Sequence, residues 1–432
     1  MIPRIAIKTL GCKLNFSESA TLERRLSSQG YRMVDFDAPA DVYVVNTCAV
    51  TEQAGRKCRY YVHRVRQRQP QAKVVLMGCY SALKAGQLQD ELGADMVLGS
   101  NTKFQLPELL PALLQGASYL YDVEKEAEKT FFGAYSLQEE RTRSFLKVQD
   151  GCNNFCTYCT VPLARGRFRS GELLALCTDA ADVVAHDIKE IVLSGVNIGA
   201  YRSEKDEDFF DLLQALSRVE GLQRLRISSI EPDLLSDEII AYVAEKDNVM
   251  PHFHIPLQSG CDRILERMHR HYPRQLYADK VQLIKQYMPQ AFVAADVIVG
   301  FPGETEADFM ETVDFLQNIP ISCLHVFPYS QRPNTPAAVM PDQVSKAVKA
   351  ERVKVLMALS DEKKTALYRS CEGQNARVLV ESKEKGGCYS GFTENYIKVK
   401  LACSEKNVNT ILPVRLCGIA DDGLMIGETV YE

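Results

Sequence analysis

Strand patterns alternate with helical patterns along most of this 432-residue chain. In residues 1–130, apolar runs predict strands at 4–10, 41–46 and 73–77, and helical residues follow each strand, the first from about Ser17 to Gln29. Consecutive parallel strands need a long crossover connection, which a helix usually supplies, so the alternation predicts a parallel sheet covered by helices. The predicted fold class is therefore α/β, beginning with a parallel α/β domain.

The alternation continues in residues 141–369 with six more strand-and-helix units. Their strands are predicted at 145–149, 190–197, 222–230, 253–260, 292–300 and 323–330. Units of this kind suggest an incomplete, open (βα)6 barrel, whose open side would admit a bulky substrate. Residues 370–432 differ, because short strands there are separated by Gly and Asp turns, which predicts a small antiparallel β-barrel.

Each of the first three predicted strands ends in a cysteine, namely Cys12, Cys48 and Cys79. The carboxyl ends of parallel strands meet at one edge of the sheet, where ligands bind in such folds. Free cysteine is also a common core residue, but core positions would fall along the strands and not three times at the same edge. We therefore predict that these thiols converge in a metal cluster with one iron open. Cys58, within the basic helix that ends near residue 69, is interpreted as structural.

A compact cysteine run, Cys152, Cys156 and Cys159, opens the second series in a C-x3-C-x2-C pattern. Three thiolates this close in sequence can surround one soft-metal centre. A structural zinc site is closed by four ligands, usually as two pairs, and no second pair follows this run. Three cysteines on a [4Fe–4S] cluster instead leave one iron open for a substrate or cofactor. The run favours such a cluster, with zinc or a chance arrangement among 14 cysteines as alternatives.

The composition indicates the compartment. Fourteen cysteines in a chain without secretory marks fit a reducing environment better than a disulfide framework. The first residues enter a strand pattern at once and lack the shape of a signal peptide. Because no run of eighteen or more apolar residues occurs, we expect a cytoplasmic protein with no membrane span.

The formal net charge of −5 argues against polyanion binding by the whole surface. Local basic clusters could still form a path for nucleic acid, and the alternative for each is a solvated helix face or loop. The clusters are Arg56, Lys57, Arg59, His63, Arg64, Arg66 and Arg68, then Arg141, Arg143 and Lys147, then Arg165, Arg167 and Arg169.

With Tyr158 as the aromatic residue before its last cysteine, the run resembles the C-x3-C-x-aromatic-C motif of the radical S-adenosylmethionine (SAM) enzymes. The resemblance implies that the open iron binds the amino and carboxylate groups of SAM, which an electron from the cluster cleaves to a 5′-deoxyadenosyl radical. It also implies further SAM contacts in three places. These are a glycine motif at residues 194–197, a strand end at residues 229–231, and residues 297–304, which resemble a G-x-I-x-G-x-P-G-E segment except that Asp296-Val297 replaces its first residues. These contacts are Tyr158, Gly195, Asn197, Ser229, Glu231, Val299 and Gly300.

The order of the three predicted domains resembles the methylthiotransferases, a family within the radical SAM enzymes. Its members bind an auxiliary [4Fe–4S] cluster through three N-terminal cysteines, which Cys12, Cys48 and Cys79 match. The segment Gly391-Phe392-Thr393-Glu394-Asn395-Tyr396 resembles the TRAM domain, an RNA-binding barrel, although a stabilising cap is the alternative. Within the family, Thr9-Leu10-Gly11-Cys12-Lys13-Leu14-Asn15 is most similar to the branch that modifies N6-threonylcarbamoyladenosine, since other branches usually have Gln or Pro in place of Lys13.

This resemblance implies a transferase that adds a methylthio group to C2 of N6-threonylcarbamoyladenosine beside the tRNA anticodon, with two [4Fe–4S] clusters and SAM. One SAM would methylate a sulfur at the N-terminal cluster, and another would supply the radical that activates the unreactive C2–H position. The implied partners are the tRNA anticodon stem-loop, an external electron donor and a sulfur donor. Alternative functions are methylthiolation of isopentenyladenosine in tRNA or of a ribosomal-protein aspartate, another radical reaction with structural N-terminal cysteines, and a zinc-dependent RNA-binding module.

Overall fold

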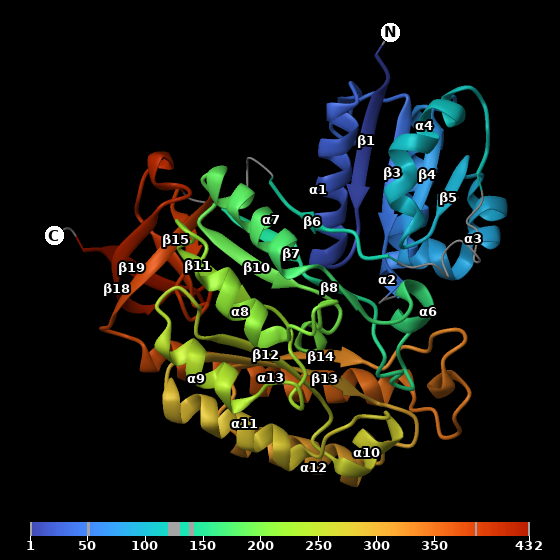
Figure 1. Cartoon of the computed structure of the whole chain (residues 1–432). Helices are drawn as coiled ribbons and strands as arrows, with labels where there is room; N and C mark the ends of the chain where they lie inside the picture. The colour runs from blue at the N-terminus through green and yellow to red at the C-terminus, as the bar shows by residue number, and fades with distance from the viewer. Residues whose placement is uncertain (1, 50–51, 120–129, 138–141, 385–386, 431–432) are drawn as a thin grey trace.

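The computed structural model describes residues 2–49, 52–119, 130–137, 142–384 and 387–430. They form an N-terminal α/β domain, a central curved sheet with helices on its outside, and a C-terminal β-barrel (Figure 1). The N-terminal domain and the C-terminal barrel lie on opposite sides of the central sheet.

The N-terminal sheet is parallel, with the strand order β2-β1-β3-β4-β5. Its strands are β1 Arg4–Thr9, β2 Arg32–Met33, β3 Val42–Thr47, β4 Lys73–Gly78 and β5 Met96–Leu98. Its helices are α1 Lys13–Ser28, α2 Glu52–Arg68, α3 Cys79–Leu92, the 3-10 turn η1 Thr102–Gln105 and α4 Leu106–Leu114. Both faces of the sheet are covered, because α1 and α4 pack on one core and α2 and α3 on the other.

This strand order confirms the predicted parallel α/β domain and places its switch point between β1 and β3. In doubly wound sheets, the carboxyl ends of the strands beside that point form the ligand crevice. Two details differ from the sequence prediction. Helix α1 begins at Lys13, four residues before the predicted start at Ser17, because the chain reverses at Gly11 and Cys12 is already the N-cap. The short strand β2 was not predicted.

The central sheet contains every strand predicted for residues 141–369. These strands are β7 Arg143–Lys147, β10 Glu190–Ser194, β11 Arg224–Ile227, β12 His252–Gln258, β13 Phe292–Val299 and β14 Cys323–Pro328. They run parallel, and bridges from Leu225 to Val249 and from Ser229 to His254 link the two halves. Among the described residues, β14 is not paired with β7, so the predicted open partial barrel is confirmed.

The remaining central elements cover or close this barrel. The outer helices are α7 Leu173–Ala185, α8 Phe209–Ser217, α9 Asp237–Glu245, α11 Arg274–Tyr287, α12 Glu306–Asn318 and α13 Lys346–Ser370. The shorter elements are β6 Ala134–Tyr135, β8 Gln149–Asp150, α6 Val161–Arg165, β9 Arg169–Ser170, η2 Ile198–Ala200, α10 Asp262–Arg267 and η3 Pro336–Ala338.

Side chains of the central strands alternate between a hydrophobic outer face and a polar inner face. Residues such as Ile191, Leu193 and Leu225 pack outward against the helices. Their neighbours face the inside of the curved sheet, a space that we call the lumen. For example, Arg226 Nε donates to Glu190 Oε1 at 2.8 Å across adjacent strands. The lumen is therefore lined by charge and not by the apolar layers of a closed barrel core.

The lumen also contains a hydrogen-bonded triad of His254, Asp296 and His325 from β12, β13 and β14. His254 Nε2 lies 2.7 Å and His325 Nδ1 lies 3.1 Å from Asp296 Oδ1. The hydrogen bond with Asp296 raises the pKa of His325 to about 10. Burial alone would raise the pKa of Asp296, but the two histidine hydrogen bonds outweigh it and hold that pKa well below its ordinary value.

The C-terminal barrel is closed, with the strand order β15-β16-β17-β19-β18. Its elements are β15 Asn375–Lys383, β16 Tyr389–Phe392, β17 Lys398–Leu401, the turn η4 Glu405–Asn407, β18 Ile411–Ile419 and β19 Met425–Thr429. The predicted barrel is confirmed, but the purely antiparallel pairing is wrong, since β17 and β19 are parallel. Strand β18 follows β17 in sequence yet pairs with β15, which leaves β19 to close the barrel against β17.

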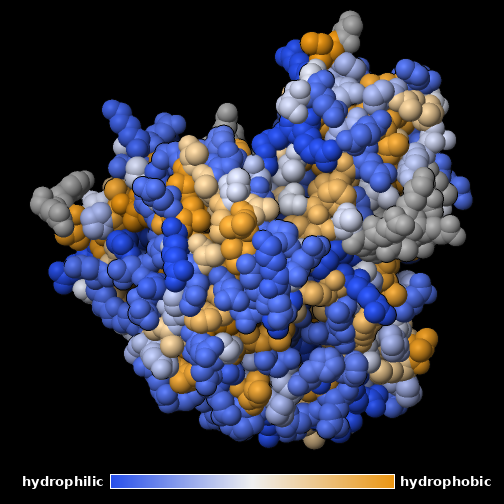
Figure 2. Space-filling view, in the orientation of Figure 1, coloured by the Kyte–Doolittle hydropathy of each residue, from blue (hydrophilic) through white to orange (hydrophobic). Residues whose placement is uncertain are grey.

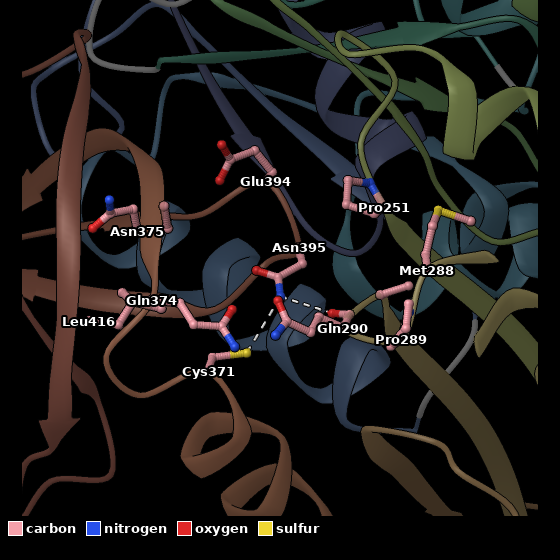
Figure 3. A pocket seen from close by; sticks show the side chains of 12 residues that line it. Pro251, Met288, Pro289, Gln290, Cys371, Gln374, Asn375, Glu394, Asn395 and Leu416 are labelled. Atoms are coloured by element: carbon pink, nitrogen blue, oxygen red, sulfur yellow. Dashed lines mark hydrogen bonds between the residues drawn. The ribbon is translucent and has the colours of Figure 1, made fainter. Parts of the chain in front are cut away.

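The barrel docks on the amino-terminal ends of the central strands. Its core is continuous with Phe292 and Cys323 of that sheet. A pocket lies at this seam (Figure 3), where Asn395 Nδ2 donates to the Gln290 carbonyl at 2.9 Å. None of the predicted site residues lines this pocket.

The surface shows no wide apolar belt in the view of Figure 2, where hydrophilic side chains cover most of the face and apolar ones form small patches. Within the described part of the chain, every helix is too short or too polar to cross a lipid bilayer.

The substitution Gly391→Ala should disrupt the C-terminal barrel, because its added Cβ would lie 2.0 Å from the Leu379 carbonyl oxygen of the paired strand. Overpacking of this kind costs about 1–3 kcal/mol. Hydrogen exchange should increase in residues 375–429. The matched control is Gly86→Ala in α3, whose added Cβ meets no described atom within 4 Å and should not destabilise the fold. Equal protection in Gly391→Ala and the unmodified protein would contradict this close packing of β16 on β15.

The substitution Asp296→Asn should lower the pKa of His325 toward its ordinary value. In the fold, His325 has a pKa of about 10, so its pairing contributes stability that is fully present below about pH 6.5 and disappears as pH rises through about 10. The difference in unfolding midpoint between the two proteins should therefore be largest near pH 6 and vanish above pH 10. NMR titration of the imidazole gives the direct measurement, and an unchanged His325 titration in the variant would contradict the assignment.

Candidate active site

The loops after β1, β3 and β4 bring Cys12, Cys48 and Cys79 together. A Cβ on Gly11 would lie 2.6 Å from Cys48 Cβ and 2.8 Å from its sulfur, so the first two loops touch. Burial raises the pKa of the Cys12 thiol, the charge of Arg165 lowers it and that of Cys79 raises it, which puts the third loop within electrostatic range. The three loops therefore lie near one another at the same edge of the sheet.

Two glycines and a network of polar groups hold these loops in place. Gly11 has φ +105° and Gly78 has φ +101°, a region that other residues rarely adopt. A Cβ on Gly78 would also lie 2.5 Å from Asn46 Oδ1. Asn15 Nδ2 donates to the Leu10 carbonyl at 2.8 Å and to the Thr47 carbonyl at 3.0 Å. Each Gly-Cys turn is thus set by local steric limits and tied to its neighbour.

The second cysteine triad lies in the loop between β8 and α6. The Asn154 amide donates to the Cys152 sulfur, and the Val161 amide donates to the Cys159 sulfur, both at 3.4 Å. Burial raises the pKa of the Cys159 thiol to about 12, and the charges of the neighbouring cysteines add to the effect. Thiolates that bind an iron–sulfur cluster accept hydrogen bonds from backbone amides of this kind.

The geometry of both triads suits a multi-atom cluster better than a single ion. Sulfurs around one zinc ion at about 2.3 Å must lie roughly 4 Å apart. In the described residues, the groups whose ligand atoms all lie within 4.8 Å of one another are His254–Asp296–His325 and Cys261–Asp308–Glu311. Neither cysteine triad is among them. Three thiols in each loop set, with amide and guanidinium donors to sulfur, fit a [4Fe–4S] cluster.

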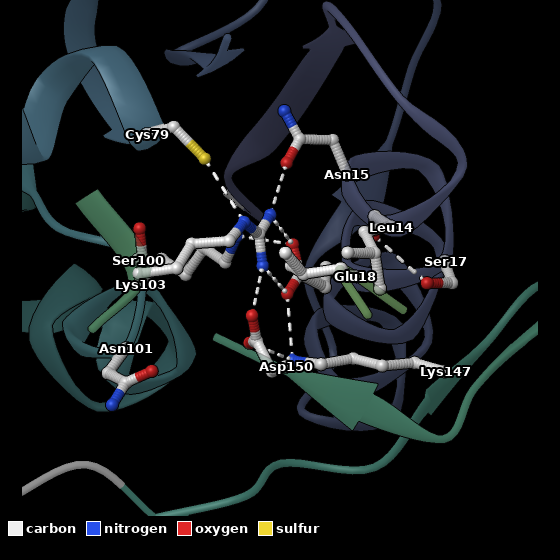
Figure 4. A network of polar contacts seen from close by, with 12 residues as sticks. Leu14, Asn15, Ser17, Glu18, Cys79, Ser100, Asn101, Lys103, Lys147 and Asp150 are labelled. Carbon is white, nitrogen blue, oxygen red and sulfur yellow. Dashed lines mark hydrogen bonds and ion pairs between the residues drawn. The ribbon is translucent and has the colours of Figure 1, made fainter. Parts of the chain in front are cut away.

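Arg165, the last residue of α6, follows the second triad in the sequence and contacts the first. Its Nε lies 3.2 Å from the Cys79 sulfur, and its Nη1 lies 3.0 Å from both Glu18 Oε1 and Asp150 Oδ1. Its Nη2 donates to Asn15 Oδ1 at 2.8 Å. Figure 4 shows its partners Cys79, Asn15, Glu18 and Asp150 converging from the two domains. One arginine next to the second cysteine loop therefore reaches a thiol of the first.

Further cations complete this buried network. Lys147 Nζ lies 2.9 Å from Glu18 Oε1 and 2.8 Å from Asp150 Oδ2, and Lys103 also pairs with Glu18. Burial alone would raise the pKa of Glu18, but Arg165, Lys103 and Lys147 outweigh it and lower that pKa strongly. Both acids are therefore held ionised.

The network corrects part of the predicted nucleic-acid path. Lys147 and Arg165 are buried ion-pair partners, so the expectation that they line such a path is wrong. Arg143 pairs with Glu381 of the C-terminal barrel, whereas Arg167 is exposed. Arg141 lies outside the described residues. The sequence showed the charges, but their buried acidic partners are distant in the chain.

The cluster along α2 is more accessible. Arg56, Lys57, His63 and Arg68 are exposed. Arg64 pairs with Asp37, and Arg66 pairs with Asp95 at 2.8 Å. Cys58, on the opposite side of the helix, is completely buried, as its structural interpretation predicts.

The predicted glycine motif lies beside the second triad. Gln149 Oε1 accepts from the Val196 and Asn197 amides at 2.9 and 2.8 Å, which ties this loop to the strand that leads into the cysteine run. A Cβ on Gly195 would lie 3.0 Å from the same oxygen. Asn197 Oδ1 is buried and has no hydrogen-bond partner among the described atoms. An orphaned acceptor here suits a donor such as the ammonium group of SAM.

Glu231 pairs with Arg270, and Tyr158 interacts with the same arginine electrostatically. The Arg270 side chain is buried, pairs with Glu231 and donates from Nη1 to the Cys156 sulfur at 3.2 Å. Ser229 ends the same strand region as Glu231 and bridges to β12 at His254. Sequence reasoning missed Arg270, because it lies in a polar connection after α10 that carries no motif.

The last predicted contacts are less well placed. Val299 directs its side chain into the hydrophobic core, and its carbonyl accepts from the Tyr329 amide at 2.8 Å. The Gly300 amide donates to Glu304 Oε2 at 2.5 Å, and Lys349 packs against this glycine. Only main-chain atoms near Gly300 remain to contact a cofactor.

Comparison with protein families gives matches to two parts of the chain. Residues 4–99 match the model described as "Uncharacterized protein family UPF0004", and residues 146–316 match the Radical SAM superfamily. The solved structure of the radical SAM methyltransferase TsrM from Kitasatospora setae superposes with a TM-score of 0.58 at 16% identity, covering 78% of this chain and 77% of that chain. At this identity, the superposition supports the fold alone.

Curated relatives span almost the whole chain. The threonylcarbamoyladenosine tRNA methylthiotransferase MtaB of Bacillus subtilis is 37% identical over 95% of this chain and 93% of its own length. The protein of the same name from Aquifex aeolicus is 36% identical over 92% and 96%. A tRNA-2-methylthio-N(6)-dimethylallyladenosine synthase of Clostridium perfringens is 33% identical over 98% and 97%. The chain therefore belongs to the radical SAM tRNA methylthiotransferase family, whose radical SAM domain carries a [4Fe–4S] cluster and binds SAM.

Proposed function

We propose that this protein is a tRNA (N6-L-threonylcarbamoyladenosine-C2)-methylthiotransferase that modifies the base beside the anticodon. The observation that carries the proposal is the bridge from Arg165, next to one cysteine triad, to Cys79 of the other. Such proximity supports two clusters that act on one substrate. The names of the Bacillus subtilis and Aquifex aeolicus relatives support the choice of base.

In this proposal, Cys152, Cys156 and Cys159 hold the radical SAM cluster, and Cys12, Cys48 and Cys79 hold an auxiliary [4Fe–4S] cluster. When bound, the clusters and SAM supply radical and sulfur chemistry that no side chain of the chain can supply. All six cysteines count as catalytic residues in this sense.

The protein's own residues orient these groups. Gln149 fixes the glycine loop through two amides, and the side-chain Oδ1 of Asn197 accepts from SAM. Arg270 holds Glu231 and donates to the Cys156 sulfur. Tyr158, Gly195, Ser229 and the main chain near Val299 and Gly300 complete the cofactor site. Arg165 fixes the separation between the cysteine loops.

We further propose three functional domains, at residues 1–130, 141–369 and 370–432. The C-terminal barrel acts as a TRAM-like RNA-binding domain for the anticodon stem-loop. Within its TRAM-like segment, Asn395 and Tyr396 contact the central barrel, so the RNA contacts lie on other faces. An external electron donor and a sulfur donor complete the reaction, which takes place in the cytoplasm.

Methylthiolation of dimethylallyladenosine in tRNA is the second candidate. It is favoured by the 33% identity to the Clostridium perfringens synthase across almost the whole chain. The two candidates differ in the substituent on N6, which is charged in one and apolar in the other.

Mass analysis of tRNA nucleosides tests the choice between these substrates. A strain that lacks the gene should lose 2-methylthio-N6-threonylcarbamoyladenosine and keep its precursor, while dimethylallyl derivatives stay unchanged. The gene should restore the product. Loss of a methylthiolated dimethylallyladenosine instead would establish the second candidate.

The substitution Cys12→Ala should remove the auxiliary cluster and leave the radical SAM cluster in place. Iron should fall from about eight to about four per chain, since one cube is lost. Reductive cleavage of SAM should continue, and the methylthiolated nucleoside should no longer form. The matched control is Cys177→Ala in α7, which should keep all the iron and the product. Unchanged iron content in Cys12→Ala would exclude a cluster at this position.

A further inference from the structure

Strands β7 and β11 carry a group of cations at their amino-terminal ends, on the side of the lumen. With the first residue of α1, they form what we call the cationic wall: Lys13, Arg143, Arg224 and Arg226. The three arginines belong to the fold, because they pair with Glu190 and Glu381 or donate to carbonyls of the C-terminal barrel. Lys13 differs from them.

The Lys13 ammonium has no hydrogen bond or ion pair among the interactions of the described residues. Its side chain is accessible to solvent, yet the protein around it desolvates it, so it occupies a hollow and not a convex surface. It lies within electrostatic range of Arg143, Arg226 and Glu190 on the inner strands and of Cys12 beside it. An unpaired cation thus faces the lumen next to the first cysteine triad.

One further feature favours an anion at this point, and a second leaves a buried polar group beside it without a partner. Lys13 begins a 16-residue helix that has no acidic residue in its first turn and no side-chain hydrogen bond from its N-cap, so no carboxylate of its first turn offsets the positive end of the helix. His252, on the inner face of β12, is only 7% exposed, and its Nδ1 has no hydrogen-bond partner in the described structure. Lys13 and His252 interact electrostatically, which places this orphaned nitrogen in the same region.

The depth of the hollow restricts the anion. The C-terminal barrel closes the lumen at this end through Tyr396, whose ring lies 4.8 Å from the Arg226 guanidinium carbon. An enzyme that acts on a ring carbon takes the base out of its stack, so the base and its N6 substituent penetrate deepest. The phosphates of the same nucleotide stay nearer the surface.

We propose that Lys13 and the start of α1 bind the carboxylate of an N6 substituent on the target adenine, and that Lys13 thereby determines substrate specificity. The proposal rests on the function proposed above and identifies the group that recognises the threonyl carboxylate. An apolar N6 substituent has no charge to offer this hollow, and it would leave the ammonium desolvated and unpaired.

The test measures binding of an anticodon stem-loop to the holoenzyme at fixed salt. One RNA carries N6-threonylcarbamoyladenosine, and a second carries the primary amide of its threonyl carboxylate, which is nearly the same shape without the charge. For the unmodified enzyme, the amide should raise Kd about tenfold or more, the range for a lost hydrogen bond between charged groups. For Lys13→Gln, the two RNAs should differ less than about twofold, and Lys13→Arg should restore the preference.

Two controls separate specificity from folding. Lys205→Gln, at an exposed turn, should keep the full preference for the carboxylate. Iron content per chain should be the same in Lys13→Gln and the unmodified enzyme. Equal discrimination by Lys13→Gln and the unmodified enzyme overturns the proposal, and so does loss of iron, which would make Lys13 a structural residue.

The failure of the proposed function has a different appearance. If the unmodified enzyme methylthiolates another base and binds the carboxylate and amide RNAs equally, the function itself is wrong. If it modifies threonylcarbamoyladenosine and Lys13→Gln retains the preference, only the assignment of Lys13 is wrong.

Discussion

The buried ion pairs of Arg165 with Glu18 and Asp150 determine how the N-terminal domain sits on the central barrel. Desolvation of such charges costs several kcal/mol per ion, and only well-placed partners offset it. Glu18 and Asp150 belong to different domains, and Arg165 contacts both while its Nε reaches the sulfur of Cys79. A shift of one domain would leave charges buried without partners. The network therefore permits one docking arrangement, and that arrangement sets the distance between the cysteine triads.

Helix α1 connects this constraint to the substrate space. Its first residue, Lys13, faces the lumen, Glu18 enters the ion-pair network one and a half turns later, and Leu22 and Leu26 pack in the core of the N-terminal sheet. The rise of about 1.5 Å per residue gives these side chains fixed separations along one axis. Substrate contact, interdomain docking and core packing are thereby rigidly coupled.

Much of this organisation follows from sequence, because it depends on local patterns. Alternating strands and helices identified the parallel sheet and the open barrel, and cysteines at equivalent strand ends indicated the convergence of Cys12, Cys48 and Cys79. The predictions failed where partners are distant in the chain. Lys147 and Arg165 look like surface cations until Glu18 is placed against them. Arg270 lacks any motif, and the parallel pairing of β17 with β19 depends on where β18 finds its neighbour.

The complete burial of Glu18 bears on the way the protein is divided. Boundaries drawn along the sequence separate this carboxylate from Lys147 and Arg165, which lie beyond residue 141. An N-terminal fragment that ends there would keep its hydrophobic sheet. Of the three cations that pair with Glu18, it would retain Lys103 and lose Lys147 and Arg165. Sequence modules and cooperative units therefore do not coincide, and the first two modules form a single thermodynamic body.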